Sequence, residues 1–273
     1  MTDTYSSLGI CMQKSTKYLI IDIDNGICTI TLDRPKFLNV FNEETLNEFS
    51  RVLDEVSKNE KVKVVVLLSA CEKAFTAGAD IKEMVVKGPK EAKKFAQLGH
   101  KIARKLEMMP QPVIIGVHGY VLGGGVEFSC ACDIRIAAED SIFAQPEIDI
   151  GVIPGWGGTQ RLSRIVGIGK AKEIIYTGKR IDAHEALEIG LVNNVVPKDK
   201  LIETVMAMAK TMAGKGKLAL FDAKKSINQL YETFIEEGLD YEVDRWTELF
   251  GTEDQKEGMR AFLEGRHPEF KDK

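Results

Sequence analysis

Hydrophobic residues near the start of the chain first alternate with polar ones, then recur at helical spacing, then run continuously. Two apolar-rich stretches, Tyr18–Ile23 and Ile27–Leu32, flank Asn25-Gly26, the strongest short signal for a hairpin with a tight turn. Asn42 can cap a helix whose apolar residues recur every three or four positions. Val62–Leu68 is a continuous apolar run, typical of a buried strand. The pattern predicts two antiparallel strands, a helix and a central strand.

Strands and helices continue to alternate in the middle of the chain. Glu91–Met108 has helical periodicity, stops before Pro110 and leads into the apolar run Val113–Val117. A strand, a crossover helix and a second strand indicate an α/β fold. After a helix expected to begin near Gly125, we expect strands at Asp133–Ala138 and Ser141–Ala144 and a loop rich in glycine and proline at Gln145–Gly158.

The pattern becomes mostly helical after Gly169, and the composition shifts near residue 200. We therefore expect an N-terminal extension (1–17), a core (18–199) and a helical C-terminal region (200–273). Ile202, Val205 and Met206 are expected to bury their side chains against the core or a neighbouring subunit. Besides a strand-like stretch at Leu191–Val196, the expected elements are helices at Lys170–Thr177, Ala183–Glu188, Lys200–Ala213, Leu218–Tyr231, Thr233–Phe250 and Asp254–Leu263.

Composition and charge narrow the class of partner. The 273 residues are 44% hydrophobic, enough for a sizeable core. With 37 basic and 41 acidic residues, the net charge is -4, which argues against nucleic acid or an anionic membrane as the partner. The longest apolar runs are too short to cross a bilayer, and Met1–Lys17 resembles neither a secretory signal nor a transit peptide. We expect a cytoplasmic protein.

Metal and disulfide chemistry are not expected. The number of cysteines is odd, and the chain is long enough to fold without covalent cross-links. No histidine stands at ligand spacing from a cysteine or from another histidine. We expect reduced, buried thiols at Cys11, Cys28, Cys71, Cys130 and Cys132.

Two glutamates stand in unusual backbone contexts and are the main catalytic candidates. Glu127 lies just after three consecutive glycines, which allow backbone N–H groups to approach a ligand closely. Glu147 lies in the segment Gln145-Pro146-Glu147. A lone glutamate in a first helical turn, or after proline, is usually structural. Two carboxyl groups brought together, however, can divide the roles of acid and base.

Sequence motifs of three other enzyme classes are incomplete or absent. Gly155-Trp156-Gly157-Gly158 begins like a dinucleotide fingerprint, but Gln160 replaces the third glycine and no strand leads into it. The sequence also contains no GxSxG elbow and no phosphate loop that ends in Gly-Lys-Ser/Thr. These observations exclude the nicotinamide, serine-hydrolase and P-loop classes.

The sequence around these residues resembles the enoyl-CoA hydratase/isomerase (crotonase) superfamily, most closely its short-chain enoyl-CoA hydratases. The resemblance covers the chain from about Tyr18 to its end. It implies a spiral of ββα units, a helical C-terminal trimerisation region and trimers commonly paired into hexamers. It also implies an enzyme of fatty acid metabolism. The segments that carry it are Arg34-Pro35 with Asn39, Ala74–Glu83, Gly119–Glu127 with Cys132-Asp133, and Pro146-Glu147 through Gly157–Leu162.

The resemblance implies how each residue acts. The backbone N–H groups of Ala79 and Gly124 would stabilise the oxyanion of an enolate-like thioester. Glu127 would accept a proton from the attacking water, and Glu147 would deliver a proton to the α-carbon. The implied reaction is the hydration of a 2-enoyl-CoA, with coenzyme A as part of the substrate and no separate cofactor.

The resemblance also implies substrate contacts. Ala77 would read the adenine through its backbone, and Lys36 would reach a phosphate. The remaining expected substrate contacts are Asp80, Ile81, Gly155 and Trp156. Asp80 and Asp133 also suit capping or buried ion pairs.

Trp156 and the Val40-Phe41 pair add bulk near the site, which favours a short acyl chain or a flat cyclic one. The open alternatives are an isomerase, a cyclic dienoyl-CoA hydratase, an acyl-CoA hydrolase and a non-enzymatic scaffold or RNA-binding relative. The intact pair of glutamates and the acidic pI argue against the last of these.

Overall fold

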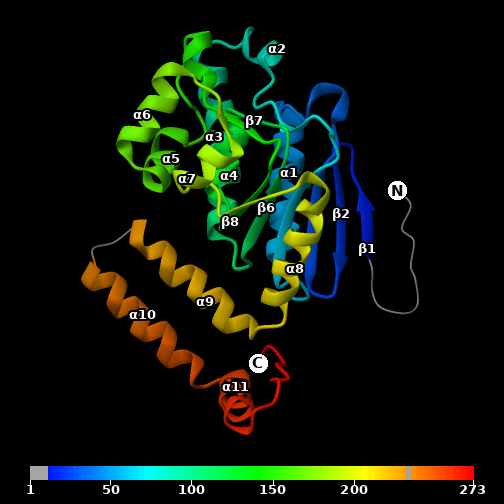
Figure 1. Ribbon diagram of the computed structural model, residues 1–273, viewed down its shortest axis with the longest axis vertical. Coiled ribbons are helices and arrows are strands. Elements are labelled where there is room, and N and C mark those ends of the chain that lie inside the picture. The colour runs from blue at the N-terminus through cyan, green and yellow to red at the C-terminus, as the bar shows by residue number, and fades with distance from the viewer. Residues whose placement is uncertain (1–11, 232–234) are drawn as a thin grey trace.

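A seven-stranded sheet forms the centre of the molecule, in the order β1-β2-β3-β4-β6-β8-β11 (Figure 1). The computed structural model describes residues 12–231 and 235–273. β2 is antiparallel to both β1 and β3, and every later pairing in this sheet is parallel. The strands are β1 (Met12–Ser15), β2 (Leu19–Asp24), β3 (Ile27–Leu32), β4 (Val64–Ser69), β6 (Val113–Val117), β8 (Ile134–Ala138) and β11 (Asn194–Val196).

The predicted hairpin is confirmed. β2 and β3 pair from Leu19 with Leu32 to Asp24 with Ile27. Asn25 and Gly26 both have positive φ, 48° and 79°, as a tight primed turn requires. Strand β1 lies within the segment that we expected to be an extension and pairs with β2, whereas the remainder of that segment, with Cys11, lies outside the described residues.

A second, four-stranded sheet has the order β10-β9-β7-β5. Its parallel pairs, β5 with β7 and β7 with β9, bring together segments far apart in sequence. Only β9 was predicted. Strands β5 and β7 lie near glycines typical of loops, Gly78, Gly119 and Gly123, and β10 is too short to show a hydrophobic period. The strands are β5 (Ala74–Thr76), β7 (Tyr120–Leu122), β9 (Ile142–Ala144) and β10 (Ile181–Asp182).

Helices connect the strands of the core and largely match the sequence prediction. The side chain of Asn42 accepts a hydrogen bond from the N–H of Thr45, which confirms it as the N-cap of α1. Helix α5 was not predicted, since it begins inside a glycine run that favours a loop. The helices of the core are α1 (Glu43–Ser57), α2 (Ile81–Met84), α3 (Pro89–Met108), α4 (Gly124–Ala131), α5 (Gly158–Val166), α6 (Ile168–Thr177) and α7 (Ala183–Glu188), with short 3-10 turns η1 (Pro35–Phe37), η2 (Pro146–Ile150) and η3 (Lys198–Lys200).

Two apolar clusters cover opposite faces of the main sheet. The larger cluster joins the sheet to α1, α3 and α4. The smaller one packs α8 (Leu201–Ala213) against the other face. Val205 is fully buried there and Met206 packs against the cluster, as expected, but Ile202 is 60% exposed. Ile202 lies on the outer side of α8, so this chain alone does not bury it.

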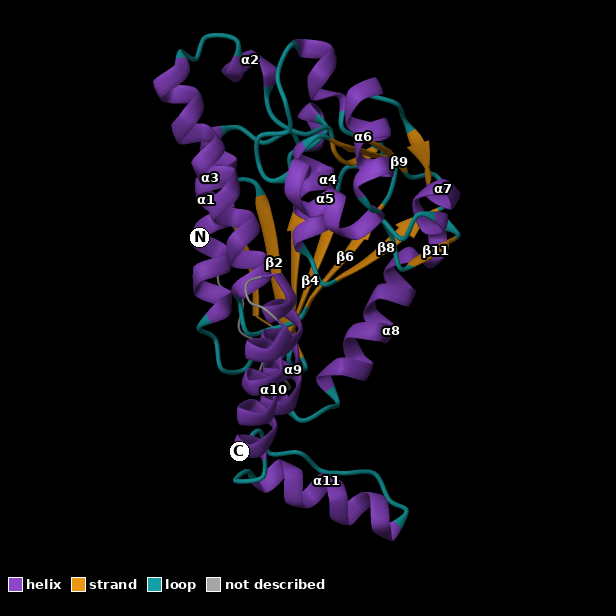
Figure 2. Ribbon diagram, turned by 90° about the vertical axis from the view of Figure 1, so that its left-hand side faces the viewer, coloured by secondary structure: helices purple, strands orange, loops and turns teal. Residues whose placement is uncertain are grey.

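The last three helices extend away from the core (Figures 1 and 2). They are α9 (Lys217–Asn228), α10 (Ile235–Leu249) and α11 (Glu253–Glu264), with the turn η4 (Gln229–Tyr231) after α9. The predicted start of α10 at Thr233 lies outside the described residues. Lys224 anchors α9 to the core through an ion pair of 2.8 Å with Asp133. This contact confirms the buried ion pair expected for Asp133.

The four described cysteines are free and buried. Burial raises the pKa of the Cys28 and Cys130 thiols to about 12, so both remain protonated and unreactive at neutral pH. In the described part of the chain, no cluster of three or more histidine, cysteine, aspartate or glutamate side chains could hold a metal ion. Nor is any described helix both long and apolar enough to cross a membrane.

Candidate active site

Three segments of the candidate site follow the carboxyl ends of three neighbouring strands. Ala77–Ala79 follows β5, Gly123-Gly124 follows β7 and Gln145–Glu147 follows β9. Because β5, β7 and β9 are parallel neighbours, these three ends lie at one edge of the small sheet. The sheet therefore brings together the predicted oxyanion donors and Glu147, although 68 positions (147 − 79) separate Ala79 from Glu147.

The turn at Gly78 orients the N–H of Ala79. Phe41 donates its N–H to the carbonyl of Gly78 at 2.8 Å, and Asp80 donates to the carbonyl of Phe41 at 2.9 Å. These two bonds flank Ala79, so its own N–H points to the opposite side of the segment. Gly78 has a φ of +89°, and a Cβ there would lie 2.8 Å from the carbonyl oxygen of Leu122. Only glycine lets the turn approach the end of β7 so closely.

The second predicted donor, Gly124, is the first residue of α4. Its N–H has no acceptor within the helix, and the helix dipole adds a favourable potential for an anion at this end. Gly123 holds the preceding turn with a φ of +51° and donates its N–H to the carbonyl of Ala144 at 2.9 Å. The side-chain amide of Gln145 in turn donates to the carbonyl of Gly123 at 3.0 Å. These bonds fix the ends of β7 and β9 to each other.

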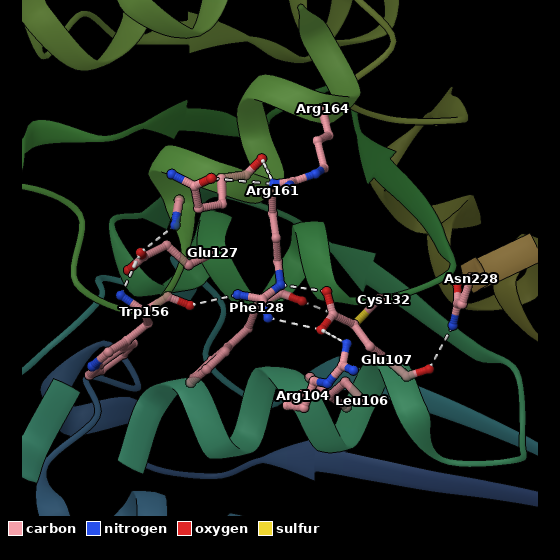
Figure 3. A network of polar contacts seen from close by, with 12 residues as sticks. Arg104, Leu106, Glu107, Glu127, Phe128, Cys132, Trp156, Arg161, Arg164 and Asn228 are labelled. Atoms are coloured by element: carbon pink, nitrogen blue, oxygen red, sulfur yellow. Dashed lines mark hydrogen bonds and ion pairs between the residues drawn. The ribbon is translucent and has the colours of Figure 1, made fainter. Parts of the chain in front are cut away.

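Glu127 lies in the first turn of α4 and is only 2% exposed. Its Oε1 accepts two backbone hydrogen bonds of 2.7 Å, from the N–H groups of Trp156 and Gly158 (Figure 3). Burial raises the pKa of the carboxyl, while these two bonds and the charge of Arg161 oppose the rise. Two N–H donors on one oxygen favour the ionised form, so Glu127 is suited to accept a proton.

Glu147 has a different environment. Its side chain lies against the turn at Gly123, where a Cβ would lie 2.9 Å from Oε1 of the carboxyl. Its Oε2 is buried and has no hydrogen-bond partner among the described residues. Burial, and secondly the charge of Glu127, raises its pKa to about 7. Near neutral pH Glu147 is thus substantially protonated and suited to donate a proton.

Trp156 is buried beneath this edge, with 3% of its surface exposed. Its ring stacks on Phe128 at 5.1 Å and meets Phe41 and Phe95 edge to face. A Cβ on Gly124 would lie 2.2 Å from Cζ3 of the indole, so the ring lies directly against the predicted oxyanion donor. Trp156 is therefore a wall of the site and part of the aromatic core at once.

The predicted coenzyme A contacts lie on the 34–41 and 77–81 segments and at Gly155. Lys36 and Ile81 are exposed, while the N–H of Ala77 is already bonded to the carbonyl of Leu38. Asp80 caps α2 by accepting from the N–H of Lys82 and pairs with Arg34 at 3.3 Å, which confirms the structural role expected for it. Gly155 is exposed, next to Trp156 in the loop that leads to α5.

Reasoning from the sequence assigned no role to Arg161 or Glu107, although Arg161 lies in one of the segments that carry the family resemblance. Arg161 forms a two-bond ion pair with Glu107 and donates to the carbonyl of Trp156 at 3.0 Å. The sequence does contain one indication that Arg161 has a specific partner. A cation near the N-terminus of a helix opposes the helix dipole, so a specific partner has to compensate for it. The identity of that partner, 54 positions away, is visible only in the structure.

Comparison with known proteins gives the family. The model of the enoyl-CoA hydratase/isomerase family matches residues 22–273. A short-chain-enoyl-CoA hydratase of Clostridium acetobutylicum is 44% identical over 91% of this chain and 95% of its own length. A crotonyl-CoA hydratase of Syntrophomonas wolfei is 41% identical over 92% of this chain and 97% of its own length.

A solved structure agrees with this result. The crystal structure of an enoyl-CoA hydratase from Bacillus anthracis superposes with a TM-score of 0.89, covers 96% of this chain and 99% of its own, and is 36% identical in sequence. This similarity confirms the predicted crotonase-type α/β fold with its helical C-terminal region. The chain belongs to the enoyl-CoA hydratase/isomerase family.

Proposed function

We propose that this chain reversibly adds water across the 2,3 double bond of a short-chain enoyl-CoA. The two relatives above support the proposal, since they are named short-chain-enoyl-CoA hydratase and crotonyl-CoA hydratase and align over almost their full lengths. The substrate class, an acyl-CoA thioester, follows from the family.

The single observation that carries the proposal is the contrast between Glu127 and Glu147. Glu127 has two N–H donors on one oxygen, while Glu147 has a buried oxygen with no partner in the described chain and a pKa raised to about 7. Hydration of an enoyl thioester needs one group that accepts a proton from water and another that delivers one. Environments that separate the protonation states of two carboxyl groups supply such a pair.

In the proposed reaction, the N–H groups of Ala79 and Gly124 stabilise negative charge on the thioester oxygen. The oxygen of water bonds to C3 of the acyl group while Glu127 accepts one proton of that water. Glu147 transfers its proton to C2. The sum is one water molecule added to the double bond, and proton exchange between the two carboxyls restores their states. The proposed steps use no cofactor besides the coenzyme A of the substrate.

Acyl length and coenzyme A contacts are part of the proposal. Trp156 and Phe41, whose rings lie 6.1 Å apart, occupy space at the base of the site and favour a short acyl chain. A flat cyclic acyl group is the second candidate, because a wall of aromatic rings also fits a planar ligand. We assign coenzyme A contacts to Lys36, Ala77, Ile81 and Gly155. Asp80 contributes indirectly, through its cap on α2.

We further propose a trimer, alone or paired into a hexamer, located in the cytoplasm. Leu239, Val243 and Trp246 are exposed and lie at helical spacing along one face of α10. A row of large apolar side chains in water favours burial against another subunit. The location rests on the sequence alone and stays a prediction.

A spectrophotometric assay tests the proposed function. The purified protein should consume crotonyl-CoA, with loss of the absorbance of the conjugated thioester, and form 3-hydroxybutyryl-CoA. A panel of C3, C4, C6, C10 and cyclic enoyl-CoAs should give the highest kcat/KM at C3 or C4. Release of free thiol would indicate the hydrolase alternative, and a shifted double bond without added water the isomerase. No turnover of any thioester would favour the non-enzymatic reading.

A further inference from the structure

The carboxylate of Glu127 is positioned by backbone rather than by another side chain. Both of its hydrogen bonds come from the segment Trp156–Gly158, and both end on Oε1 at 2.7 Å. The direction of these N–H groups thus sets where the carboxylate lies and how strongly its charge is stabilised. Whatever fixes this segment also fixes the proposed base.

Arg161 is the side chain that fixes it. Its Nη1 donates to the carbonyl of Trp156 at 3.0 Å. The guanidinium also occupies the space beside Gly157, where a Cβ would lie 1.8 Å from Nη1. Gly157 has a φ of +110°, so glycine is required at this position both by the backbone and by the arginine.

Glu107 of α3 holds the guanidinium in turn. Nε of Arg161 bonds Oε1 of Glu107 at 2.5 Å, and Nη2 bonds Oε2 at 2.9 Å (Figure 3). This planar two-bond geometry is specific to arginine with a carboxylate. Asn228 of α9 donates to the backbone carbonyl of Glu107 at 2.9 Å. A cavity of about 600 Å³ between α3, α4, α5 and α9 borders this pair.

We propose that Arg161, held by Glu107, is a positioning residue for Glu127, acting through the carbonyl of Trp156 and the N–H groups of Trp156 and Gly158. The proposal rests on the proposed function, since it assumes that Glu127 is the base. A purely structural ion pair would contribute to folding but would leave kcat and its pH dependence unchanged.

The charges near Glu127 predict the sign of the pH effect. Loss of Arg161 removes a nearby positive charge and loosens two N–H donors, and both changes raise the pKa of Glu127. A base must be ionised to accept a proton. In a plot of kcat against pH, the low-pH side (the acid limb) should therefore move to higher pH. The titratable and charged groups that face this region are His100, Arg104 and Glu107 of α3, Cys130 of α4, Glu147 of η2, and Arg161 and Arg164 of α5. Of the two arginines of α5, Arg161 is the one whose charge opposes the rise in the pKa of Glu127, whereas Arg164 is exposed to solvent.

The test compares Arg161→Gln with the parent enzyme on crotonyl-CoA. We expect kcat to fall about 10- to 100-fold, as for a displaced catalytic group, while KM changes less than about 3-fold. The acid limb should move up by roughly half a pH unit to one unit. Arg161→Lys keeps the charge but lacks the two-bond geometry, so it should restore the limb and only part of kcat.

Two further variants make the result decisive. Glu107→Gln leaves Arg161 in place but weakens its support, so kcat should fall while the acid limb does not rise, because a negative charge is removed. If Arg161→Gln does not fold, the kcat of Glu107→Gln tests on its own whether the ion pair positions Glu127. The matched control is Arg164→Gln, an exposed arginine one turn further along α5 that bonds the carbonyl of Gln160. It should keep the parental kcat and profile.

Several results would overturn the proposal. Parental kcat and an unmoved acid limb in folded Arg161→Gln would contradict it, as would an equal loss in Arg164→Gln. Parental kcat in Glu107→Gln would show that the ion pair holds nothing that the reaction needs. The activity of Glu127→Gln distinguishes failure of this positioning proposal from failure of the proposed function. If Glu127→Gln is inactive while the Arg161 and Glu107 variants behave like the parent, the base is correct and only its positioning is not.

Discussion

At the residue scale, two glutamates of identical chemistry are set apart by the backbone around them. Glu127 receives N–H donors from a segment that follows it by about thirty positions in sequence, whereas Oε2 of Glu147 receives none from the described chain. The sequence was enough to select both residues, because a glycine run and a Pro-Glu pair are visible in it. The difference between their hydrogen-bond partners arises from tertiary contacts and could not be predicted.

Burial of Glu147 should cost stability in a pH-dependent way. Its pKa is raised from 4.5 to about 7, so at pH 4 the carboxyl is protonated in both the folded and the unfolded state. As the pH rises from 4.5 to 7, the unfolded state ionises first and the folded state is penalised, and above pH 7 the penalty is complete. Glu147→Gln removes it and should raise the free energy of unfolding by up to about 3 kcal/mol at pH 8.

Urea denaturation at pH 4, 6 and 8, at one protein concentration, measures this effect. The gain of Glu147→Gln over the parent should be absent at pH 4 and largest at pH 8. Glu188→Gln, at an exposed position, serves as the control and should show no such trend. A gain for Glu147→Gln that is equal at all three pH values would mean that burial of the charge is not its cause.

At the element scale, predictions from local signals succeeded and those that needed distant partners did not. The Asn25-Gly26 turn and the Asn42 cap each depend on a few neighbouring residues, and both are confirmed. Strands β5 and β7 are short and lie near glycines typical of loops, so only their pairing with each other and with β9 identifies them. The family resemblance implied that Ala79, Gly124 and the two glutamates act together, but neither it nor the pattern predicted the sheet edge at which the structure places their segments.

The aromatic cluster below the site should limit acyl length. Trp156→Ala removes a ring that lies against Gly124 and stacks on Phe128, which should open space for a longer chain. The ratio of kcat/KM for C4 enoyl-CoA to that for C8 or C10 should therefore decrease. Each methylene that the ring excludes from the parent pocket corresponds to about 1–3 kcal/mol of this discrimination. The measurement is kcat/KM over the chain-length series in parent and variant.

The same substitution should also destabilise the core, because a buried tryptophan replaced by alanine costs about 3–5 kcal/mol. Trp156→Phe is the control, since it keeps a ring and should retain more of both stability and selectivity. If Trp156→Ala folds and assembles but its C4 to C10 ratio is unchanged, chain length is set elsewhere, with Met84, Val85 and Met108 as the next residues to test.

At the scale of the whole molecule, the C-terminal helices expose several large apolar side chains. Trp246 is 62% exposed on α10 and Val243 60%, and Ile202 on α8 is exposed to a similar degree. A trimer-based assembly would bury such surfaces. Light scattering should therefore give a mass of three or six chains rather than a stable monomer of about the chain's 30.3 kDa.

A charge on the apolar face of α10 should weaken this assembly. Val243→Glu is expected to shift the mass towards smaller species, because an ionised carboxylate is costly to bury. Asp244→Asn, at the neighbouring exposed position, changes the charge without interrupting the apolar face and should keep the parental mass. A parental mass for Val243→Glu would place the subunit interface on another surface.

The division of acid and base roles between Glu127 and Glu147 is tested most directly by the kinetics of Glu127→Gln and Glu147→Gln with crotonyl-CoA. Each substitution removes one proton-transfer group but leaves the backbone donors of Ala79 and Gly124 in place. We predict that kcat falls by at least about 100-fold in each variant, with little change in binding of the CoA ester. Near-parental turnover in either variant would contradict the paired-carboxylate mechanism and favour an isomerase or hydrolase.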